Sequence, residues 1–551
     1  MDTSASDDFD ILAQLRSNFG TFNGDLTYIT QLLREAESTI SALPTEQHRD
    51  NFLLIDRLRS LLTPIRRLPP DVLGCLFSLS CTESELADKT DCPVVNLSQV
   101  CSGWRELARA TPSLWARLSM DISKSKLSVD AITSMIDTHL TLSGQCPLHL
   151  SLVLPGNTAT MMDASRAILR SVASHSVRWE TVCLKIFQDL LLDPNLALIR
   201  DNLPLLKHLE VWPNTEKDDE EYFPEPIPVL DVFRSAPMLR SFKLGGTDWD
   251  DEYALAEIQL PWMQLEDITL GYHRLETASQ RLAEASAARA VTFYRCSEGS
   301  MTADCWAHNM QSLTICMRNS WRYEVDDFFQ NFSGLTLPHL TSLRVLGQNS
   351  GYWPTEWSTM VGDFLWFLER SACSLTSFTV VNISISSFDA LELLRAMPTL
   401  LHLTLHELPD EAFEEGGDTT FTDNFLQQMS LSDTSTNNHG PYLPHLQSLS
   451  FRVNSHFNTS LFVRLVRSRW IPNSEHGAEM GVGCLKKVEL RFIGGIPTEA
   501  DFMEEIRPLM VLRGAGLEFA MNGEGARGLV VNRTFLRRSN LTLHMYLQSY
   551  Q

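Results

Sequence analysis

The sequence predicts an α/β solenoid built on a parallel sheet and preceded by a small all-α unit of three helices. A short apolar template recurs along residues 148–512, each time with the alternation of a strand. Helix-like runs separate the occurrences, and a proline often stands just before the next strand. At 551 residues the chain is also too long for one hydrophobic core, so several units are expected.

Composition excludes several classes of partner. Lys and Arg number 45 and Asp and Glu 68, so the formal charge is −23. We expect no nucleic-acid partner, because proteins that bind a phosphate backbone usually carry a basic face. No apolar stretch reaches the roughly 18 residues of a membrane helix, and the acidic segment Met1–Asp8 lacks the features of a secretory signal. Eleven cysteines without paired spacing indicate reduced thiols, hence a cytoplasmic or nuclear protein with no membrane role.

The first 64 residues predict a tail and two helices. Residues 1–23 are polar and weakly patterned, which indicates a flexible tail. Within residues 24–64, apolar stripes at helical spacing run from Leu26 to Leu43 and from Leu54 to Ile65. Two interpretations stay open: the helices pack on the neighbouring domain, or they form a short coiled coil that self-associates.

Residues 65–118 predict three short helices that stand apart from both flanks. Pro69 and Pro70 start the first helix, because proline is tolerated in a first turn. The polar segment Thr82–Pro93 is expected to be a loop, and Thr111-Pro112 ends the third helix. A unit of about 50 residues is marginally stable alone and gains from burial against a partner. The apolar positions on the three helices are Val72, Leu73, Leu76, Phe77, Leu97, Val100, Trp104, Leu107 and Ala108.

The order of these residues resembles the F-box, in the version common in fungal proteins. Leu68-Pro69 is followed by Val-Leu-x-x-Leu-Phe from Val72, by Leu-x-x-Val-Cys-x-x-Trp-Arg from Leu97, and by Thr-Pro-x-Leu-Trp from Thr111. The resemblance implies binding to the Skp-family adaptor of Skp–cullin–F-box ubiquitin ligases, and through it to a cullin. It also implies that some residues of a predicted adaptor-binding set contact the adaptor and that others pack in the core of the box. The set is Leu68, Pro69, Val72, Leu73, Leu76, Phe77, Leu97 and Val100.

A helical linker is expected at residues 119–147, the repeats at 148–512 and a strand-rich cap at 513–551. A doubly wound sheet is the less favoured alternative, because no glycine-rich turn follows the first strand. The template Leu-x-x-Leu-x-Leu begins, in its clear occurrences, at Leu206, Leu239, Leu265, Leu340, Leu375, Leu400, Leu446 and Leu485. Weaker occurrences lie at Leu148–Leu154, Trp179–Leu184, Val291–Phe293 and Leu313–Ile315.

The repeated template resembles an irregular leucine-rich-repeat array. The asparagine usual at the ninth position is present only as Asn214 and Asn454, which implies a divergent arc. The resemblance implies that residues between the framework leucines line an inner surface that binds an unknown protein target. Arg452 and Arg491 make one end of it basic, so an acidic or phosphorylated segment is expected there. The candidate target-binding residues are Trp212, Arg344, His402, His406, Arg452 and Arg491.

Polar insertions interrupt this pattern. Thr215–Glu221 and the segment from Pro409 to Tyr442 are predicted to be mobile, because they are polar and rich in acidic residues, serine or threonine.

No motif predicts catalysis, a metal or a cofactor. Gly523–Gly528 matches G-x-G-x-x-G, but the strand-like Leu529–Asn532 that follows indicates a hairpin turn rather than a nucleotide site. His402 and His406 are placed on a strand without a third ligand. We therefore expect a non-catalytic adaptor that brings its target close to the ubiquitin-loaded enzyme for ubiquitin-dependent degradation. The alternatives are a scaffold that holds an adaptor without a ligase, and an enzyme with a site on the inner surface of the repeats.

Overall fold

The structure is a computed structural model of the 551-residue chain. Its contacts divide the chain into two units, Met1–Pro261 and Trp262–Gln551, each described by itself. The residues described are Ile11, Leu15, 26–42, 48–81, 85–86, 92–125, 127–214, 231–245, 258–271, 275–294, 306–307, 309–316, 335–347, 357–383, 385–407, 419–431, 440–454, 457–493, 495–497 and 500–524.

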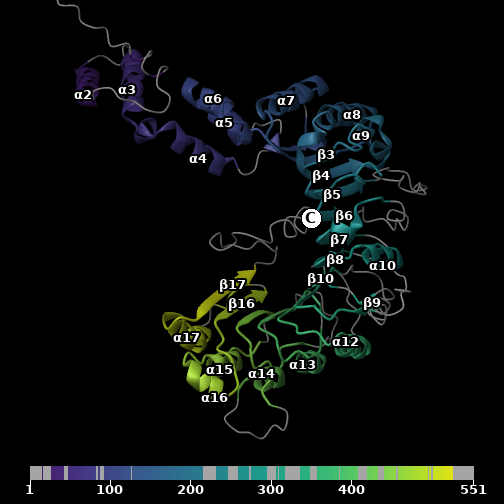
Figure 1. The fold of residues 1–551 in the computed structure, drawn as a ribbon. Helices are drawn as coiled ribbons and strands as arrows, with labels where there is room; N and C mark the ends of the chain where they lie inside the picture. The colour runs from purple at the N-terminus through teal and green to yellow at the C-terminus, as the bar shows by residue number, and fades with distance from the viewer. Residues whose placement is uncertain are drawn as a thin grey trace, which may run out of the picture. The chain divides into compact units, whose positions relative to one another are not determined.

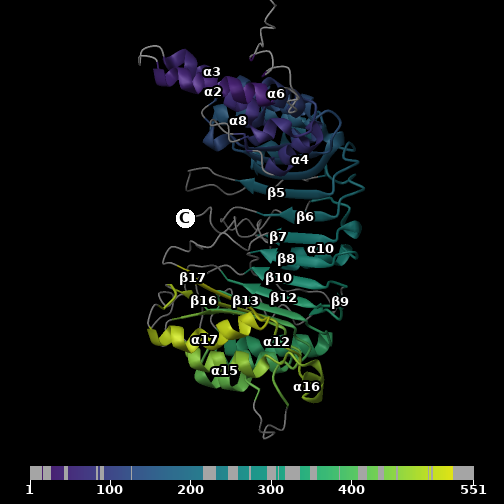
Figure 2. The same ribbon diagram turned by 90° about the vertical axis from the view of Figure 1, so that its left-hand side faces the viewer.

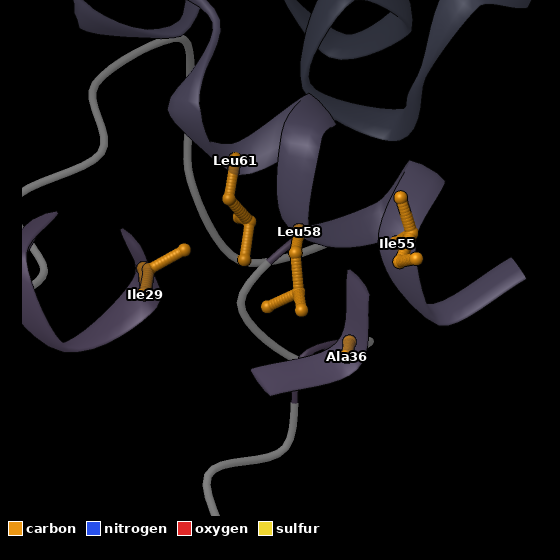
Figure 3. Packing of buried hydrophobic residues seen from close by; sticks show 5 residues of the cluster. All are labelled: Ile29, Ala36, Ile55, Leu58 and Leu61. Atoms are coloured by element: carbon orange, nitrogen blue, oxygen red, sulfur yellow. The ribbon is translucent and has the colours of Figure 1, made fainter. Parts of the chain in front are cut away.

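Two helices pack together at the start of the first unit. Helices α2 (Leu26–Ala42) and α3 (His48–Leu62) confirm the two predicted apolar stripes. Their buried side chains point toward one another (Figure 3): Ile29, Ala36, Ile55, Leu58 and Leu61. Self-association through these helices stays a prediction.

The predicted tail needs one correction. Ile11 and Leu15 are helical and pack against the cluster between α2 and α3, since their spacing of four places both on one face. The other residues of 1–23 lie outside the described residues.

Three helices of the box follow, as the sequence predicts. Helix α4 (Pro70–Ser80) begins with proline in its first turn, and α5 (Pro93–Val100) does the same. Helix α6 (Ser102–Arg109) ends just before Thr111-Pro112. Short 3₁₀ turns at Pro64–Arg67 and Pro112–Leu114 flank the three helices.

A parallel sheet in chain order forms the rest of the first unit. Each strand is hydrogen-bonded in parallel to the next. The strands are β1 (Glu85–Leu86), β2 (Arg117–Asp121), β3 (Leu148–Leu154), β4 (Trp179–Phe187), β5 (His208–Asn214) and β6 (Ser241–Leu244).

The strands β1 and β2 correct the predicted loop and linker. The expected loop Thr82–Pro93 contains β1 and the start of α5, and the expected helical linker 119–147 begins inside β2. Leu118 and Met120 alternate with more exposed residues, which is strand spacing and not helical spacing. The box is therefore continuous with the sheet.

Helices cover one face of this sheet (Figure 1). Residues that alternate along β3 are buried against them, and the residues between are more exposed. The helices are α7 (Val129–Leu142), α8 (Ala159–Ala173) and α9 (Pro194–Ala197), with 3₁₀ turns at Ile122–Lys124, Ser176–Arg178 and Gln188–Leu192.

The second unit repeats the same construction. Its long sheet is parallel and follows chain order, with paired residues in constant register. The strands are β7 (Asp267–Gly271), β8 (Ala290–Tyr294), β10 (Ser312–Cys316), β12 (Ser342–Leu346), β13 (Ser377–Val381), β14 (His402–His406), β15 (Ser448–Val453), β16 (Lys487–Ile493) and β17 (Glu518–Glu524). Strands β9 (Trp306–Ala307) and β11 (Leu335–Thr336) pair separately. Figure 2 shows β7, β8, β10 and β12 as successive strands of this sheet.

The helices of the second unit lie on one side of its strands (Figure 1). They are α10 (Leu275–Glu284), α12 (Trp357–Ser371), α13 (Ser387–Arg395), α14 (Asp423–Met429), α15 (Thr459–Arg469), α16 (Ser474–Glu479) and α17 (Ala500–Gly514), with a 3₁₀ turn at Trp262–Gln264. Every template occurrence found in the sequence forms a parallel strand, so the predicted α/β architecture with a large parallel sheet is confirmed.

Helix α14 corrects the prediction of a mobile segment from Pro409 to Tyr442, because part of that segment packs in the core. Phe425, Leu426 and Met429 are buried, because their spacing gathers them on one helical face. Phe421, which precedes the helix, is buried beside Phe425. The insertion Thr215–Glu221, residues 408–418 and 432–439, and the predicted turn and strand after Glu524 lie outside the described residues. Within the predicted cap, β17 is described and pairs in parallel with β16.

Candidate functional site: an exposed apolar face on the box and the open face of the sheet

The box has a closed core of its own. Leu73 and Phe77, on one face of α4, are 1% and 2% exposed. The Phe77 ring lies 4.9 Å from the ring of Trp104 on α6. Trp115 is buried, and its Nε1 donates a hydrogen bond of 2.7 Å to the carbonyl of Ala108. Both tryptophans therefore serve the core of the box.

The adjacent face of α4 leaves large apolar side chains in solvent. Val72, Leu76 and Leu79 are 44%, 41% and 74% exposed. Spacings of four and three residues place them in one row along the helix. Val100, at the end of α5, is 61% exposed. We call Val72, Leu76, Leu79 and Val100 the exposed apolar set. Exposed apolar side chains gathered on one helix face indicate a surface that another protein covers.

The predicted adaptor-binding residues divide between these two environments. Leu73 and Phe77 lie in the core. The remaining predicted residues are exposed or half-buried: Leu68, Pro69, Val72, Leu76, Leu97 and Val100. Their contact with an adaptor stays a prediction. Sequence reasoning missed Leu79, although its spacing of seven from Val72 and three from Leu76 continues the same helical row.

A buried imidazole anchors the box to the sheet region. His139 of α7 lies with its ring 4.9 Å from that of Trp115, and its Nε2 is 3.6 Å from Cys92 Sγ. Burial lowers the pKa of His139, and a hydrogen bond to the Met135 carbonyl opposes that shift. The ring is therefore neutral near pH 7 and acts as a packing residue. Strand β2 begins two residues after Trp115 and pairs with β3. The end of the box is therefore held both by the core around Trp115 and by the sheet.

On the face of the second unit's sheet that its helices do not cover, three predicted target-binding residues lie side by side. His406, Arg452 and Arg491 are register partners on β14, β15 and β16. His406 Nε2 is 3.1 Å from Ser450 Oγ, which donates a 3.4 Å hydrogen bond to Glu489 Oε2. The structure therefore brings these three together in one polar network.

The two arginines of this network have carboxylate or amide partners within the chain. Arg491 Nε donates a 2.9 Å hydrogen bond to Glu489 Oε1. Arg452 is buried, and its Nη1 donates a 2.6 Å hydrogen bond to Oδ1 of Asn382. Asn382 adopts a φ of 57°, a left-handed conformation that asparagine tolerates better than most residues. The predicted basic end is thus less available to an anionic ligand than the sequence alone suggests.

The environment of His406 limits its chemistry. Burial, together with Arg491 and Arg452, lowers the pKa of His406 to about 3. An imidazole with that pKa does not accept a serine proton near pH 7, because an effective general base has a pKa near the working pH. The Ser450–His406 pair is therefore a hydrogen bond of the sheet face and a poor nucleophile–base pair.

The remaining predicted target-binding residues are dispersed. His402 is exposed and Arg344 half-buried, on β14 and β12 of the second unit. Trp212 belongs to β5 of the first unit, where its Nε1 donates a 2.6 Å hydrogen bond to Glu210 Oε1. A Cβ at Gly245 would lie 1.6 Å from a ring carbon of Trp212, so glycine just after β6 leaves room for the indole.

The described part of the chain has neither a metal site nor a membrane-spanning helix. It holds no group of three or more His, Cys, Asp or Glu side chains placed to bind a metal. None of its helices combines the length and apolar character needed to cross a bilayer.

Comparison with known proteins identifies one region. No curated protein matches the chain. The F-box-like family model matches residues 65–121, which contain α4, α5, α6 and β2. The predicted limits of 65–118 differ from this match by only the last residues of β2. Residues 65–121, with their closed aromatic core and exposed apolar set, thus form an F-box-like domain.

Proposed function

We propose that the chain is the target-recognition subunit of a Skp–cullin–F-box ubiquitin ligase. The F-box-like domain, in the version common in fungal proteins, binds a Skp-family adaptor and through it a cullin. The observation that carries this proposal is the exposed apolar set: Val72, Leu76, Leu79 and Val100 stay in solvent although the domain's core is complete without them. The role belongs to the cytoplasm or nucleus, where a reduced chain of this kind would meet such an adaptor.

The apolar set has enough surface to support an interface. Burying one Val or Leu side chain fully contributes about 1.5–3 kcal/mol, and these residues start 41–74% exposed. A few central apolar anchors usually supply most of the affinity of an interface. The half-buried Leu68 and Leu97 of the predicted set extend the same interface.

The parallel sheet region is proposed to be a divergent leucine-rich-repeat solenoid that binds the target. Three features support this interpretation: strands that pair in chain order, a constant register, and helices that cover only one face. The open face of each unit's sheet is proposed to contribute residues for target binding. Trp212 lies in the first unit, and the second unit contains Arg344, His402, His406, Arg452 and Arg491.

The proposed action is proximity rather than catalysis by this chain. Holding a target beside the ubiquitin-loaded enzyme raises its effective concentration without any new chemical group. The low pKa of His406, which makes its pairing with Ser450 unsuitable for nucleophilic catalysis, supports a non-enzymatic role.

Affinity purification of the intact chain tests the proposal. We expect a Skp homologue and a cullin to co-purify with the natural sequence, and neither with Val72→Asp/Leu76→Asp. Ser78→Asp, an exposed position on α4 outside the apolar row, is the matched control and should retain both. Capture of the adaptor without a cullin would instead favour a scaffold that assembles no ligase. Absence of any Skp homologue would contradict both roles.

A further inference from the structure

Lysine is scarce in this chain and unevenly distributed. Nine of its 45 Lys and Arg residues are lysines. Seven of these lie in the first unit, Met1–Pro261, beside 16 arginines. The second unit, Trp262–Gln551, has 20 arginines and only two lysines, Lys486 and Lys487. The preference for arginine is therefore strongest in the unit that carries most of the candidate target-binding residues.

The stability of the fold does not account for this preference. Exposed arginines of the second unit include Arg464 and Arg467 of α15 and Arg507 and Arg513 of α17. At a solvated position lysine supplies the same charge, and the guanidinium is superior mainly where it binds a carboxylate through two atoms or stacks on a ring. The two side chains differ in one reaction, because a lysine amine can lose its proton and be acylated, whereas a guanidinium stays protonated. Arginine in place of lysine therefore removes acceptors for ubiquitin from this surface.

The two lysines of the second unit stand together at the start of β16. The backbone N–H groups of Lys486 and Lys487 both donate to the carbonyl of Gln447, with N···O distances of 2.7 and 3.0 Å. The Lys486 carbonyl accepts a 2.9 Å hydrogen bond from the N–H of Glu518. Neighbouring residues of an extended chain point to opposite sides, so the two amines extend in different directions, and both residues are exposed. A backbone held by the strands on both sides thus presents two solvated amines.

The lysine side chains described in the first unit are less accessible. Lys185, Lys207 and Lys243 are half-buried. Lys207 Nζ also lies 2.5 Å from Glu180 Oε1 in an ion pair. The structure does not describe the side chains of the other four lysines of this unit, Lys89, Lys124, Lys126 and Lys217. Among the lysine side chains that it does describe, the exposed ones are therefore the adjacent pair before and at the start of β16.

We propose that Lys486 and Lys487 form the ubiquitin-acceptor site of the second unit. This inference rests on the proposed function, which brings the chain beside a ubiquitin-loaded enzyme. The lysine ammonium gives one proton to water, and the amine attacks the carbonyl carbon of the thioester that joins ubiquitin to that enzyme. The C–N isopeptide bond forms and the C–S bond breaks, while the second proton of the nitrogen leaves with the sulfur as the enzyme's thiol. The scarcity of lysine confines this modification to one place on the second unit, away from the rest of its surface.

A reconstituted transfer assay with the full chain tests the site. The chain is incubated with a Skp-family adaptor, a cullin, ubiquitin, its activating and conjugating enzymes and ATP, and mass spectrometry of tryptic peptides locates the attached ubiquitin. We expect the diglycine remnant of ubiquitin at Lys486 or Lys487. Lys486→Arg/Lys487→Arg keeps both charges and should lose most of the ubiquitin attached to the chain while retaining the adaptor. Lys185→Arg/Lys243→Arg is the matched control and should be modified as the natural sequence is.

Amine labelling of the intact chain separates this site from the proposed function. N-hydroxysuccinimidyl acetate should acetylate Lys486 and Lys487 faster than Lys185, Lys207 and Lys243, because the first two are exposed. Slow labelling of both would overturn the inference. So would an assembled ligase that leaves the chain unmodified, modifies other lysines only, or modifies Lys486→Arg/Lys487→Arg equally, and in these cases the proposed function would stand. If no adaptor is captured, the proposed function fails and the inference fails with it, even where both amines label fast.

Discussion

The F-box-like domain and the sheet of the second unit treat apolar side chains in opposite ways. In β14, Leu403 and Leu405 are buried, and the residues between and beside them are polar. In α4, Leu73 and Phe77 close the core, yet Val72, Leu76 and Leu79 on the adjacent face remain exposed. A surface that remains exposed to solvent is usually polar. A surface that a partner covers is often apolar, because burial of apolar side chains stabilises the complex. The comparison agrees with the proposed adaptor interface on the box and the proposed target surface on the sheet.

The largest expected effect is the loss of stability when a buried phenylalanine is removed from the core of the box or of the sheet. Phe77→Ala should lower the free energy of unfolding by about 3–5 kcal/mol, because it leaves a cavity beside Trp104. Phe378→Ala in β13, which is equally buried, should cost a similar amount. Chemical denaturation measures both, with the exposed Phe388→Ala as control. A negligible effect of Phe77→Ala would show that the box core is not as closed as described.

The next effect separates the two faces of α4. Val72→Asp/Leu76→Asp should weaken adaptor binding by about 100-fold, since it places charges in the apolar interface. The same double variant should change the free energy of unfolding by about 0.5 kcal/mol or less, because both residues are exposed. Surface plasmon resonance and denaturation measure the two quantities. A large loss of stability with binding intact would reverse the assignment of the faces.

Arg452 and Arg491 test how much burial matters on the sheet face, because they are register partners that differ in burial. Arg452→Ala should cost about 2 kcal/mol of stability, since it removes a buried charged donor from Asn382. Arg491→Ala should cost about 0.5 kcal/mol, because its pair with Glu489 is partly exposed. Thermal denaturation of the two variants under identical conditions gives the difference. Equal costs would contradict the burial difference on the sheet face.

A smaller effect should appear on acidification. The pKa of His406 is lowered to about 3 from its ordinary value of 6.5, so below pH 6.5 the unfolded chain takes up the proton first. Stability should therefore fall as the pH decreases from 6.5 toward 3, with a contribution of about 1 kcal/mol by pH 6. His406→Gln should flatten this part of the profile, and His402→Gln on the same strand is the control. An unchanged profile in His406→Gln would place that imidazole in a more solvated environment.

The sequence predicted those elements whose signal is local. Leu403 and Leu405 alternate with polar residues and so predict β14, and Pro70 marks the start of α4. Strand β2 was missed because Leu118 and Met120 are a short alternation next to the box, where helices were expected. The buried state of Arg452 could not be predicted, because its partner Asn382 lies 70 residues earlier in the chain. The same limit applies to the predicted site residues. The sequence pattern predicts which face of a helix or strand a side chain occupies, but it does not predict which residues cover that side chain.

Titration calorimetry of the intact chain with a purified Skp-family adaptor tests the central claim most directly. Burial of the row formed by Val72, Leu76 and Leu79 predicts saturable binding with a negative change in heat capacity. The binding heat should disappear in Val72→Asp/Leu76→Asp and persist in Ser78→Asp. No binding by the natural sequence, or equal binding by the double variant, would contradict the claim that the exposed face of α4 is an adaptor interface.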